Sequence, residues 1–186
     1  MTVVMEDRQL EKLAIKAANG NAKAYGQLIE YYKEYLYRTA WLMVKNQDKA
    51  LDIVGECILR GFRSIQTLQK PEYFKSWLTR VLINVAKSDY RKNPDMESLN
   101  DKEDWMNGAS EYEEGISCEE RMDLHHAIDL LPEKQRTVII LKYFDEMKID
   151  EIAYVMRIPV GYVKAYLNRA RTELKTILKE DYLYER

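Results

Sequence analysis

The sequence predicts an all-α fold, in which two small helical bundles are joined by a flexible acidic linker. Glycine and proline are sparse, at 7 and 4 of 186 residues, and no alternating β-branched runs stand out. Apolar residues recur at intervals of three and four over most of the chain, which is the period of an amphipathic helix. One strongly acidic stretch with little periodicity separates the two periodic parts.

The charge distribution supports this division. The formal net charge is only −2, but residues 93–120 contain ten acidic side chains and one basic, whereas the remainder contains 21 acidic and 28 basic. The two mildly basic ends are suited to binding a polyanion such as nucleic acid, and the acidic middle is expected to have a different role. We therefore expect domains at 1–92 and 117–186, with the linker at 93–116.

The first domain is expected to contain four helices. Asn19 to Asn21 should end the first, Asp48 is a plausible N-cap for the third, and Pro71 should open the fourth. Their approximate bounds are 10–17, 22–45, 49–65 and 72–92.

The third helix has an apolar and an acidic face. Asp52 and Glu56 lie four residues apart away from the apolar stripe, where two carboxylates repel slightly and need a partner or plain solvation. Cys57 falls on an apolar stripe and is expected to be a buried small hydrophobe. The predicted core stripe consists of Val54, Ile58, Phe62 and Ile65.

The fourth helix carries a second stripe beside its core side. Basic residues in it can neutralise phosphates, and the amide of Asn84 can donate to and accept from a base edge. Tyr73, Trp77 and Tyr90 are aromatics that can stack on unpaired bases, whereas Phe74 is better explained as core. The stripe consists of Arg80, Asn84, Lys87 and Arg91, and the core side of Phe74, Leu78, Val81, Leu82 and Val85.

The second domain is expected to end in a helix-turn-helix. Ser117 and Glu120 resemble a capping box that starts a helix ending near Leu131, and another helix follows at about 133–144. Residues 148–171 then read as two helices around a corner at Arg157, and a tail from 178 onward should fray. The first of the two should bury Ile149, Ile152, Ala153 and Met156, and the second Val163, Leu167, Ala170 and Leu174.

The outer face of the last helix suits the DNA major groove, because it is polar, aromatic and basic with one small residue. A plain helical hairpin with a solvated basic face is the alternative reading of this pattern taken alone. The outer residues are Tyr162, Lys164, Ala165, Asn168, Arg169 and Arg171.

Other classes of function find no support in the pattern. The start of the chain has no signal peptide, and no apolar run reaches the length of a membrane span, so a cytoplasmic location is expected. No nucleophile, metal-ligand or phosphate-loop pattern is present, so we expect no enzyme activity, no cofactor, no metal and no small-molecule substrate.

Two separate blocks of sequence resemble one family, the extracytoplasmic-function (ECF) sigma factors of bacterial RNA polymerase. ALDIVGECILRGF (Ala50 to Phe62) resembles the helix of the family that binds core polymerase, and FKSWLTRVLINVAKSDYRK (Phe74 to Lys92) resembles the helix that melts and reads the −10 element. Leu131 to Leu174 resembles the domain that reads the −35 element. The order of the blocks, with a variable linker between them, is more specific than either block alone.

The resemblance implies roles for individual residues. Asp52 and Glu56 would contact core polymerase. The −10 residues would be Trp77, Arg80, Asn84, Lys87 and Arg91, next to a loop at about 65–75 that captures a flipped base. The −35 residues would be Tyr162, Lys164, Ala165, Asn168 and Arg169.

The chain departs from the family pattern at four positions. Gly55 replaces the usual Gln, and Ser88 stands where Asp is frequent. Arg157 replaces the turn Gly, which strains a left-handed turn by about 1 kcal/mol, and Tyr162 replaces a Thr. These departures bear on turn geometry and promoter preference more than on the kind of function.

The resemblance thus implies a factor that binds the β′ clamp and β flap of core RNA polymerase, recognises promoter DNA in two places, and is controlled by a membrane-anchored anti-sigma partner. Such a partner would hold the factor at the membrane. The alternative is a stand-alone helix-turn-helix regulator that binds DNA without polymerase, against which the Asp52 and Glu56 helix argues. A second alternative is an interaction protein that only holds another protein, against which the basic stripes argue.

Overall fold

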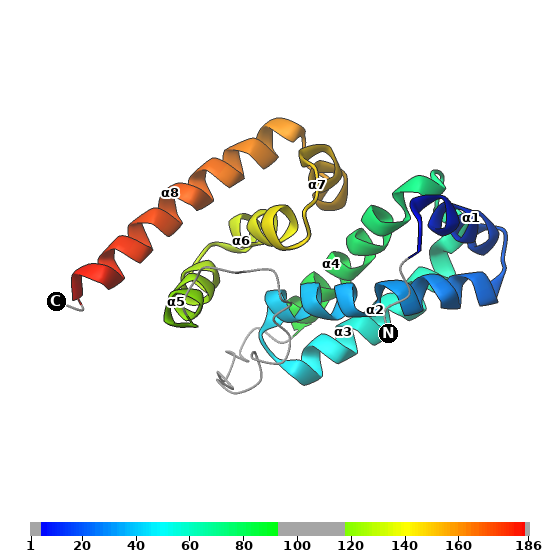
Figure 1. Cartoon of the computed structure of the whole chain (residues 1–186), viewed down its shortest axis with the longest axis horizontal. Helices are drawn as coiled ribbons and strands as arrows, with labels where there is room; N and C mark the ends of the chain where they lie inside the picture. Colours follow the sequence, from blue (N-terminus) through cyan, green and yellow to red (C-terminus); the bar gives the residue numbers. More distant parts are fainter. Residues whose placement is uncertain (1–4, 93–117, 185–186) are drawn as a thin grey trace. The chain divides into compact units, whose positions relative to one another are not determined.

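The computed structural model describes residues 5–92 and 118–184, and the side chains of 5–89 and 123–179. All regular structure in these ranges is helical, as predicted. The chain divides into two compact units, the first built from α1 to α4 and the second mainly from α5 to α8 (Figure 1). The predicted linker, 93–116, lies outside the described residues, so the domain boundaries stay a prediction. No helix of the described part has the length and apolar character needed to cross a membrane.

The first unit packs three helices, α1, α3 and α4, around α2. Two short 3₁₀ turns, η1 and η2, connect α3 to α4, and α2 packs against α1, α3 and α4. The bounds are α1 (Asp7–Ala18), α2 (Ala22–Val44), α3 (Gln47–Ser64), η1 (Ile65–Thr67), η2 (Pro71–Tyr73) and α4 (Phe74–Lys92).

Asparagine side chains begin two of these helices. The Asn21 side chain accepts from the Ala24 N–H at 3.0 Å and caps α2, and the Asn46 side chain accepts from the Lys49 N–H at 2.9 Å and caps α3. The expectation that Asp48 caps α3 is wrong, because Asn46 is the residue with an extended backbone, at φ −146° and ψ 127°. Asp48 lies in the first turn of the helix instead.

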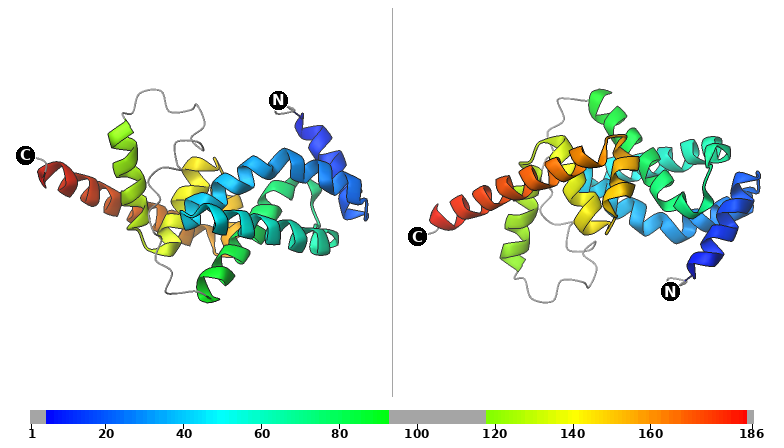
Figure 2. Two further views of the ribbon diagram at one scale, coloured as in Figure 1. Left: turned by 90° about the horizontal axis from the view of Figure 1, so that it is seen from below. Right: turned by 90° about the horizontal axis from the view of Figure 1, so that it is seen from above.

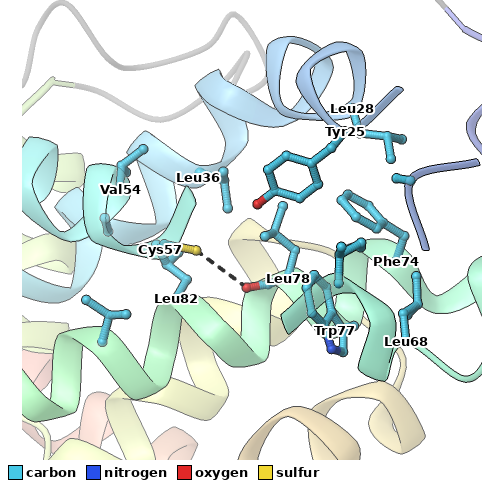
Figure 3. Close-up of a cluster of buried hydrophobic side chains, with 14 of the residues drawn as sticks. Tyr25, Leu28, Leu36, Val54, Cys57, Leu68, Phe74, Trp77, Leu78 and Leu82 are labelled. Atoms are coloured by element: carbon cyan, nitrogen blue, oxygen red, sulfur yellow. Dashed lines mark hydrogen bonds between the residues drawn. The ribbon is translucent and has the colours of Figure 1, made fainter. Parts of the chain in front are cut away.

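The first core is organised around Tyr25 and Cys57 (Figure 3). The Tyr25 hydroxyl donates to the Ile58 carbonyl at 2.8 Å, and a Cβ at Gly61 would collide with that hydroxyl. Gly61 is therefore the position at which α3 makes room for the tyrosine. Cys57 is completely buried, as predicted, and its Sγ lies 3.8 Å from the Leu78 carbonyl oxygen.

The buried face of α3 differs from the predicted stripe. Phe62 is 48% exposed, so its assignment to the core is wrong, and Ile58 is only half-buried. The adjacent Gly61 takes the inward position because the Tyr25 ring fills the space that a large side chain would need. The buried residues of α3 and of the turn that follows are Ala50, Ile53, Val54, Cys57, Gly61 and Ile65.

The second unit ends in one long helix. The segment predicted as a helix at 133–144 is α6 followed by a π-helical turn, η4. Figure 2 shows α8 as a continuous helix in both views, and it runs to Tyr184, so the expected fraying of the tail from 178 is not what the structure shows. The bounds are α5 (Cys118–Asp129), α6 (Glu133–Ile139), η4 (Ile140–Phe144), α7 (Ile149–Met156) and α8 (Val160–Tyr184).

Helices α7 and α8 form the predicted helix-turn-helix. Arg157 lies in the left-handed region at φ 56° and ψ 45°, as its place in the turn implied, and Pro159 immediately precedes α8. The inward face of α7 is shifted by one position, because Val155 is buried together with Ile152, whereas Ala153 is half-buried. The predicted inward face of α8 is confirmed by the burial of Val163, Leu167 and Ala170.

Candidate nucleic-acid and polymerase interfaces

The outer face of α8 is exposed as predicted. At about 100° per residue, Ala165 and Asn168 lie near its middle. Lys164 lies on one flank and Arg169 on the other, so a small and an amide side chain stand between basic ones. Phosphate contacts position a protein on DNA and base contacts specify sequence, and this arrangement provides for both. The exposed residues are Tyr162, Lys164, Ala165, Asn168, Arg169 and Arg171.

Tyr143 is a neighbour of this face that sequence reasoning missed. It belongs to η4, and its hydroxyl accepts a hydrogen bond from Arg171 Nε at 2.8 Å. The Arg171 guanidinium also lies 5.8 Å from the centre of the Tyr143 ring. The two residues are 28 positions apart, so the periodicity of one helix carries no signal for the pair.

A shallow depression of about 430 Å³ lies beside Asn168 and Arg169. Gln135 of α6 contributes to it, and its Oε1 is buried without a hydrogen-bond partner among the described residues. The Thr172 hydroxyl, also in the lining, donates to the Asn168 carbonyl at 3.0 Å. The depression joins α6 to the outer face of α8, which no pattern within one helix predicts.

On α4, the described side chains of the basic stripe are exposed to different degrees. Asn84 is exposed, and Arg80 and Lys87 are half-buried. The side chains of Arg91 and Tyr90 lie outside those that the structure describes. The amide of Asn84 is therefore the most accessible described member of the stripe.

Trp77 does not fit its predicted role as a DNA contact. Its side chain is 2% exposed and its ring lies 5.8 Å from that of Phe74, within the hydrophobic core of the first unit. A ring covered in this way cannot stack on a base, so we interpret Trp77 as a residue that positions α4. Phe74 is core, as expected.

The segment expected to capture a flipped base folds into η1 and η2. Ile65 and Leu68 anchor it in the core, whereas Tyr73 remains exposed. Lys70 Nζ lies 5.6 Å from the centre of the Tyr73 ring, and Lys75 Nζ lies 4.6 Å from that of Tyr35. An exposed aromatic with a cation on its face is therefore available beside α4.

The acidic pair on α3 lies on an accessible surface. Asp52 is exposed, and Glu56 Oε1 accepts from Arg60 Nε at 2.6 Å, which supplies the partner that two close carboxylates need. An exposed pair of this kind adds little stability, at most about 1 kcal/mol.

Beside these carboxylates runs an apolar strip, which we define as Leu51, Gly55, Leu59 and Phe62. The three large side chains are exposed, and the space next to Gly55 is open. Their spacing of four, four and three residues places them along one side of α3. The sequence pattern contained this strip, but it could not be told from a core stripe until the packing of Gly61 was known.

Cys57, the buried thiol of the first unit, is poorly suited to chemistry. Burial raises its pKa from an ordinary 9.0 to about 12, so the thiol stays protonated near neutral pH. In the described part of the chain, no group of three or more His, Cys, Asp or Glu side chains could hold a metal ion.

Comparison with protein families matches both units. The family model "Sigma-70 region 2" matches residues 28–94, which include α3 and α4. The model "Sigma-70, region 4" matches residues 121–174, which include the helix-turn-helix. The two matches thus contain the helices on which the candidate interfaces lie.

Full-length relatives give the same result. The chain is 36% identical over 153 residues to RNA polymerase sigma factor SigV of Bacillus subtilis (strain 168), covering 81% of this chain and 89% of that protein. It is 28% identical over 185 residues to ECF RNA polymerase sigma factor SigW of the same organism, covering 94% and 99%.

Solved structures share the fold. CnrH, solved in complex with the cytosolic domain of CnrY, matches with a TM-score of 0.70 at 23% identity, over 93% of this chain and 99% of that one. The sigma factor RpoE, solved with the anti-sigma factor NepR from Bartonella quintana, matches with a TM-score of 0.67 at 22% identity, over 85% and 98%. With both region matches and these relatives, the chain belongs to the ECF sigma factors of the sigma-70 family, which bind core RNA polymerase and direct it to promoters.

Proposed function

We propose that this sigma factor divides its work among three helices. Helix α3 binds core polymerase, α4 reads and melts the −10 element, and α8 reads the −35 element. The observation that carries the proposal is that each helix buries one face in its own unit and leaves exposed a face of the chemistry that its target requires.

On α8, Asn168 and Ala165 would meet base edges in the major groove. An Asn amide pairs with two edge atoms of adenine, and the methyl of Ala suits the methyl of thymine. Lys164 and Arg169, on the two flanks, would contact phosphates. Tyr162 is exposed near the start of α8, so it would adjoin the same groove.

On α4, Asn84 would contact a base of the −10 element after the base leaves the stack. Flipping costs unstacking free energy, which a held base must recover through hydrogen bonds and stacking. Arg80, Lys87 and Arg91 would contact phosphates, and Trp77 would hold α4 in place from the core side. Tyr73 offers an exposed ring for stacking beside this helix.

On α3, the apolar strip together with Asp52 and Glu56 would bind the β′ clamp of core polymerase. Interfaces concentrate their binding energy in apolar residues surrounded by polar ones, and α3 presents that combination on its outer side. The second unit would contact the β flap.

The wider proposal adds regulation and domain limits. Relatives of the same fold were solved with the cytosolic domain of CnrY and with the anti-sigma factor NepR, which supports a protein partner that sequesters this chain. A membrane-anchored anti-sigma factor would keep it at the cytoplasmic side of the membrane until release. The domains would be 1–92 and 117–186, joined by an acidic linker at 93–116.

Run-off transcription tests the proposed function. The full chain and core polymerase are incubated with genomic fragments, including the one upstream of the gene for this protein, and transcripts are mapped. We expect defined start sites with the wild type. Asn84→Ala should impair open-complex formation on those promoters, because it removes the base-reading amide. Lys164→Ala should weaken promoter binding and reduce its salt dependence, because it removes a phosphate contact.

The controls separate the rival functions. Lys16→Ala on α1 removes an exposed lysine outside both DNA-facing helices and should leave transcription unchanged. Footprints on promoter DNA from the chain alone, with no transcript in the presence of polymerase, would favour a stand-alone regulator. Normal open complexes with Asn84→Ala would contradict the role assigned to that residue.

A further inference from the structure

We infer that Tyr143 is a positioning residue for DNA binding, which holds the Arg171 guanidinium ready to bind a backbone phosphate beside α8. The inference rests on the proposed −35 reading by α8 and adds two residues to it. It comes from a contact between two elements, η4 and α8, of the second unit.

The geometry leaves the phosphate-binding part of Arg171 exposed. Its Nε donates to the Tyr143 hydroxyl at 2.8 Å, which uses one of the five N–H groups of the guanidinium. The remaining four belong to the two terminal amino groups, which suit two-point binding of a phosphate. Tyr143 is 51% exposed and Arg171 is also exposed, so DNA can reach both.

Tyr143 restrains the Arg171 side chain through two contacts. Its hydroxyl oxygen accepts from Arg171 Nε. The ring of Tyr143 lies 5.8 Å from the guanidinium carbon, which restricts the directions in which Arg171 can turn.

The position on α8 points to the DNA backbone rather than to bases. Arg171 follows Lys164 by seven residues and precedes Lys175 by four, which places all three within about 40° of one another around the helix. Together they form a basic flank, which we define as Lys164, Arg171 and Lys175, and all three are exposed. Asn168 and Ala165 occupy the middle of the outer face, so the flank would border the groove, where phosphates lie.

Pre-organisation gives Tyr143 its effect. A free arginine side chain has many rotamers, and ordering it on binding costs free energy. A hydrogen bond that already selects the orientation in the unbound protein lowers this cost. Loss of the Tyr143 hydroxyl should therefore weaken binding only when Arg171 is present.

A double-mutant cycle tests this dependence. Holoenzyme is assembled from core polymerase and the full chain, as wild type, Tyr143→Phe, Arg171→Ala or the double variant. Affinity for a promoter fragment recovered by run-off transcription is measured over a range of KCl concentrations. Arg171→Ala should lower affinity about 8-fold at 0.1 M salt and reduce the slope of log K against log salt by about 0.9, the values for one lost phosphate contact.

Tyr143→Phe should lower affinity roughly 3-fold in the wild-type background and have no effect in the Arg171→Ala background, because coupled residues are not additive. Arg171→Lys keeps the charge but lacks Nε, so it should retain the salt slope and lose the dependence on Tyr143. Thermal unfolding should be the same in all of these chains, which excludes a general loss of fold.

Two results would overturn the inference. Unchanged promoter affinity with Arg171→Ala would show that Arg171 makes no phosphate contact. Equal effects of Tyr143→Phe in the wild-type and Arg171→Ala backgrounds would show that Tyr143 does not position Arg171. Lys164→Ala, measured in parallel, separates these failures from a failure of the proposed function. If Lys164→Ala weakens promoter binding and Arg171→Ala does not, only the inference fails. If neither variant weakens promoter binding, the proposed −35 role of α8 fails as well.

Discussion

Residues other than glycine adopt the left-handed backbone conformation at Lys45, Glu146 and Arg157, with φ of 49°, 54° and 56°. Lys45 ends α2 and Arg157 ends α7, at the position where helices favour glycine. A side chain in this conformation costs about 1 kcal/mol, so the surrounding contacts must impose each turn. The turn that leads from α7 into α8 therefore contains a strained residue, Arg157.

Arg157→Gly is expected to stabilise the second unit. Glycine adopts φ near 56° without strain, and the net gain should be at most about 0.5 kcal/mol after the larger entropy of glycine in the unfolded chain is subtracted. Urea unfolding of the full chain followed by circular dichroism measures the change. Lys175→Gly is the matched control, because it also replaces a long basic side chain but inside the right-handed α8, and it should destabilise. A loss of stability with both variants would show that Arg157 makes contacts that outweigh the strain.

Cys57 makes the stability of the first unit sensitive to alkaline pH. Burial raises its thiol pKa from 9.0 to about 12, so the folded state holds this proton more tightly than the unfolded state. The resulting stability is complete below pH 9 and is lost as the pH rises toward 12. Each such group adds a slope of up to about 1.4 kcal/mol per pH unit within that window.

Cys57→Ala should remove part of this slope. The free energy of unfolding is measured between pH 8 and pH 10.5 for both chains, and the wild type should fall more steeply. The variant should keep some dependence, because burial also raises the pKa of Tyr32 to about 12 and that of Tyr25 further still. Identical slopes for the two chains would mean that the thiolate is accommodated in the fold.

At the scale of the element, local sequence determines where α3 begins but not which side it buries. The N-cap of α3 is Asn46, two residues before the predicted Asp48, because the Asn46 side chain accepts from the backbone N–H of Lys49 in the first turn. The inward face is displaced from the predicted stripe because Tyr25 requires Gly61 beneath its hydroxyl. The displacement leaves Phe62 outside, where it extends the apolar strip proposed to bind polymerase.

Asn46→Ala is expected to destabilise the first unit by about 1 kcal/mol, since one N–H of α3 loses its acceptor. Thermal unfolding of the full chain measures the loss. Asn46→Ser should restore most of it, because serine also caps helices. Asp48→Ala should cost less, about 0.3–1 kcal/mol, since that carboxylate interacts only with the helix dipole. A larger loss at Asp48 than at Asn46 would reverse the assignment of the cap.

At the scale of the whole molecule, each of the two units carries one helix that we propose to bind DNA, and the net charge changes sign along the chain. The ends are basic and residues 93–120 are acidic. A negatively charged segment can occupy a basic channel that later receives nucleic acid, which makes it a candidate for controlling initiation rather than binding. This role is a hypothesis from composition, since 93–116 lie outside the described residues.

The hypothesis that the acidic segment controls initiation is tested by replacing Glu111, Glu113 and Glu114 with Gln. We expect altered abortive initiation or promoter escape with unchanged promoter affinity, because the substitutions leave both helices that we propose to bind DNA intact. Gel-shift assays of holoenzyme and counts of short and full-length transcripts measure the two effects separately. A matched variant with three exposed acidic residues of α1 and α2 neutralised, Glu11, Glu30 and Glu34, should change neither. Normal escape with the linker variant would end the hypothesis.

The sequence by itself determined the helical class, the approximate bounds of the helices, the helix-turn-helix and the outer placement of Asn84 and Lys164. These follow from periodicity and end signals, which act within a few residues. Tertiary structure decided that Phe62 lies at the surface, that Trp77 is core, and that Tyr143 contacts Arg171. Periodicity specifies which residues share a side of a helix, but the shapes of the packed neighbours decide which of two adjacent sides turns inward and which residues from distant elements come into contact.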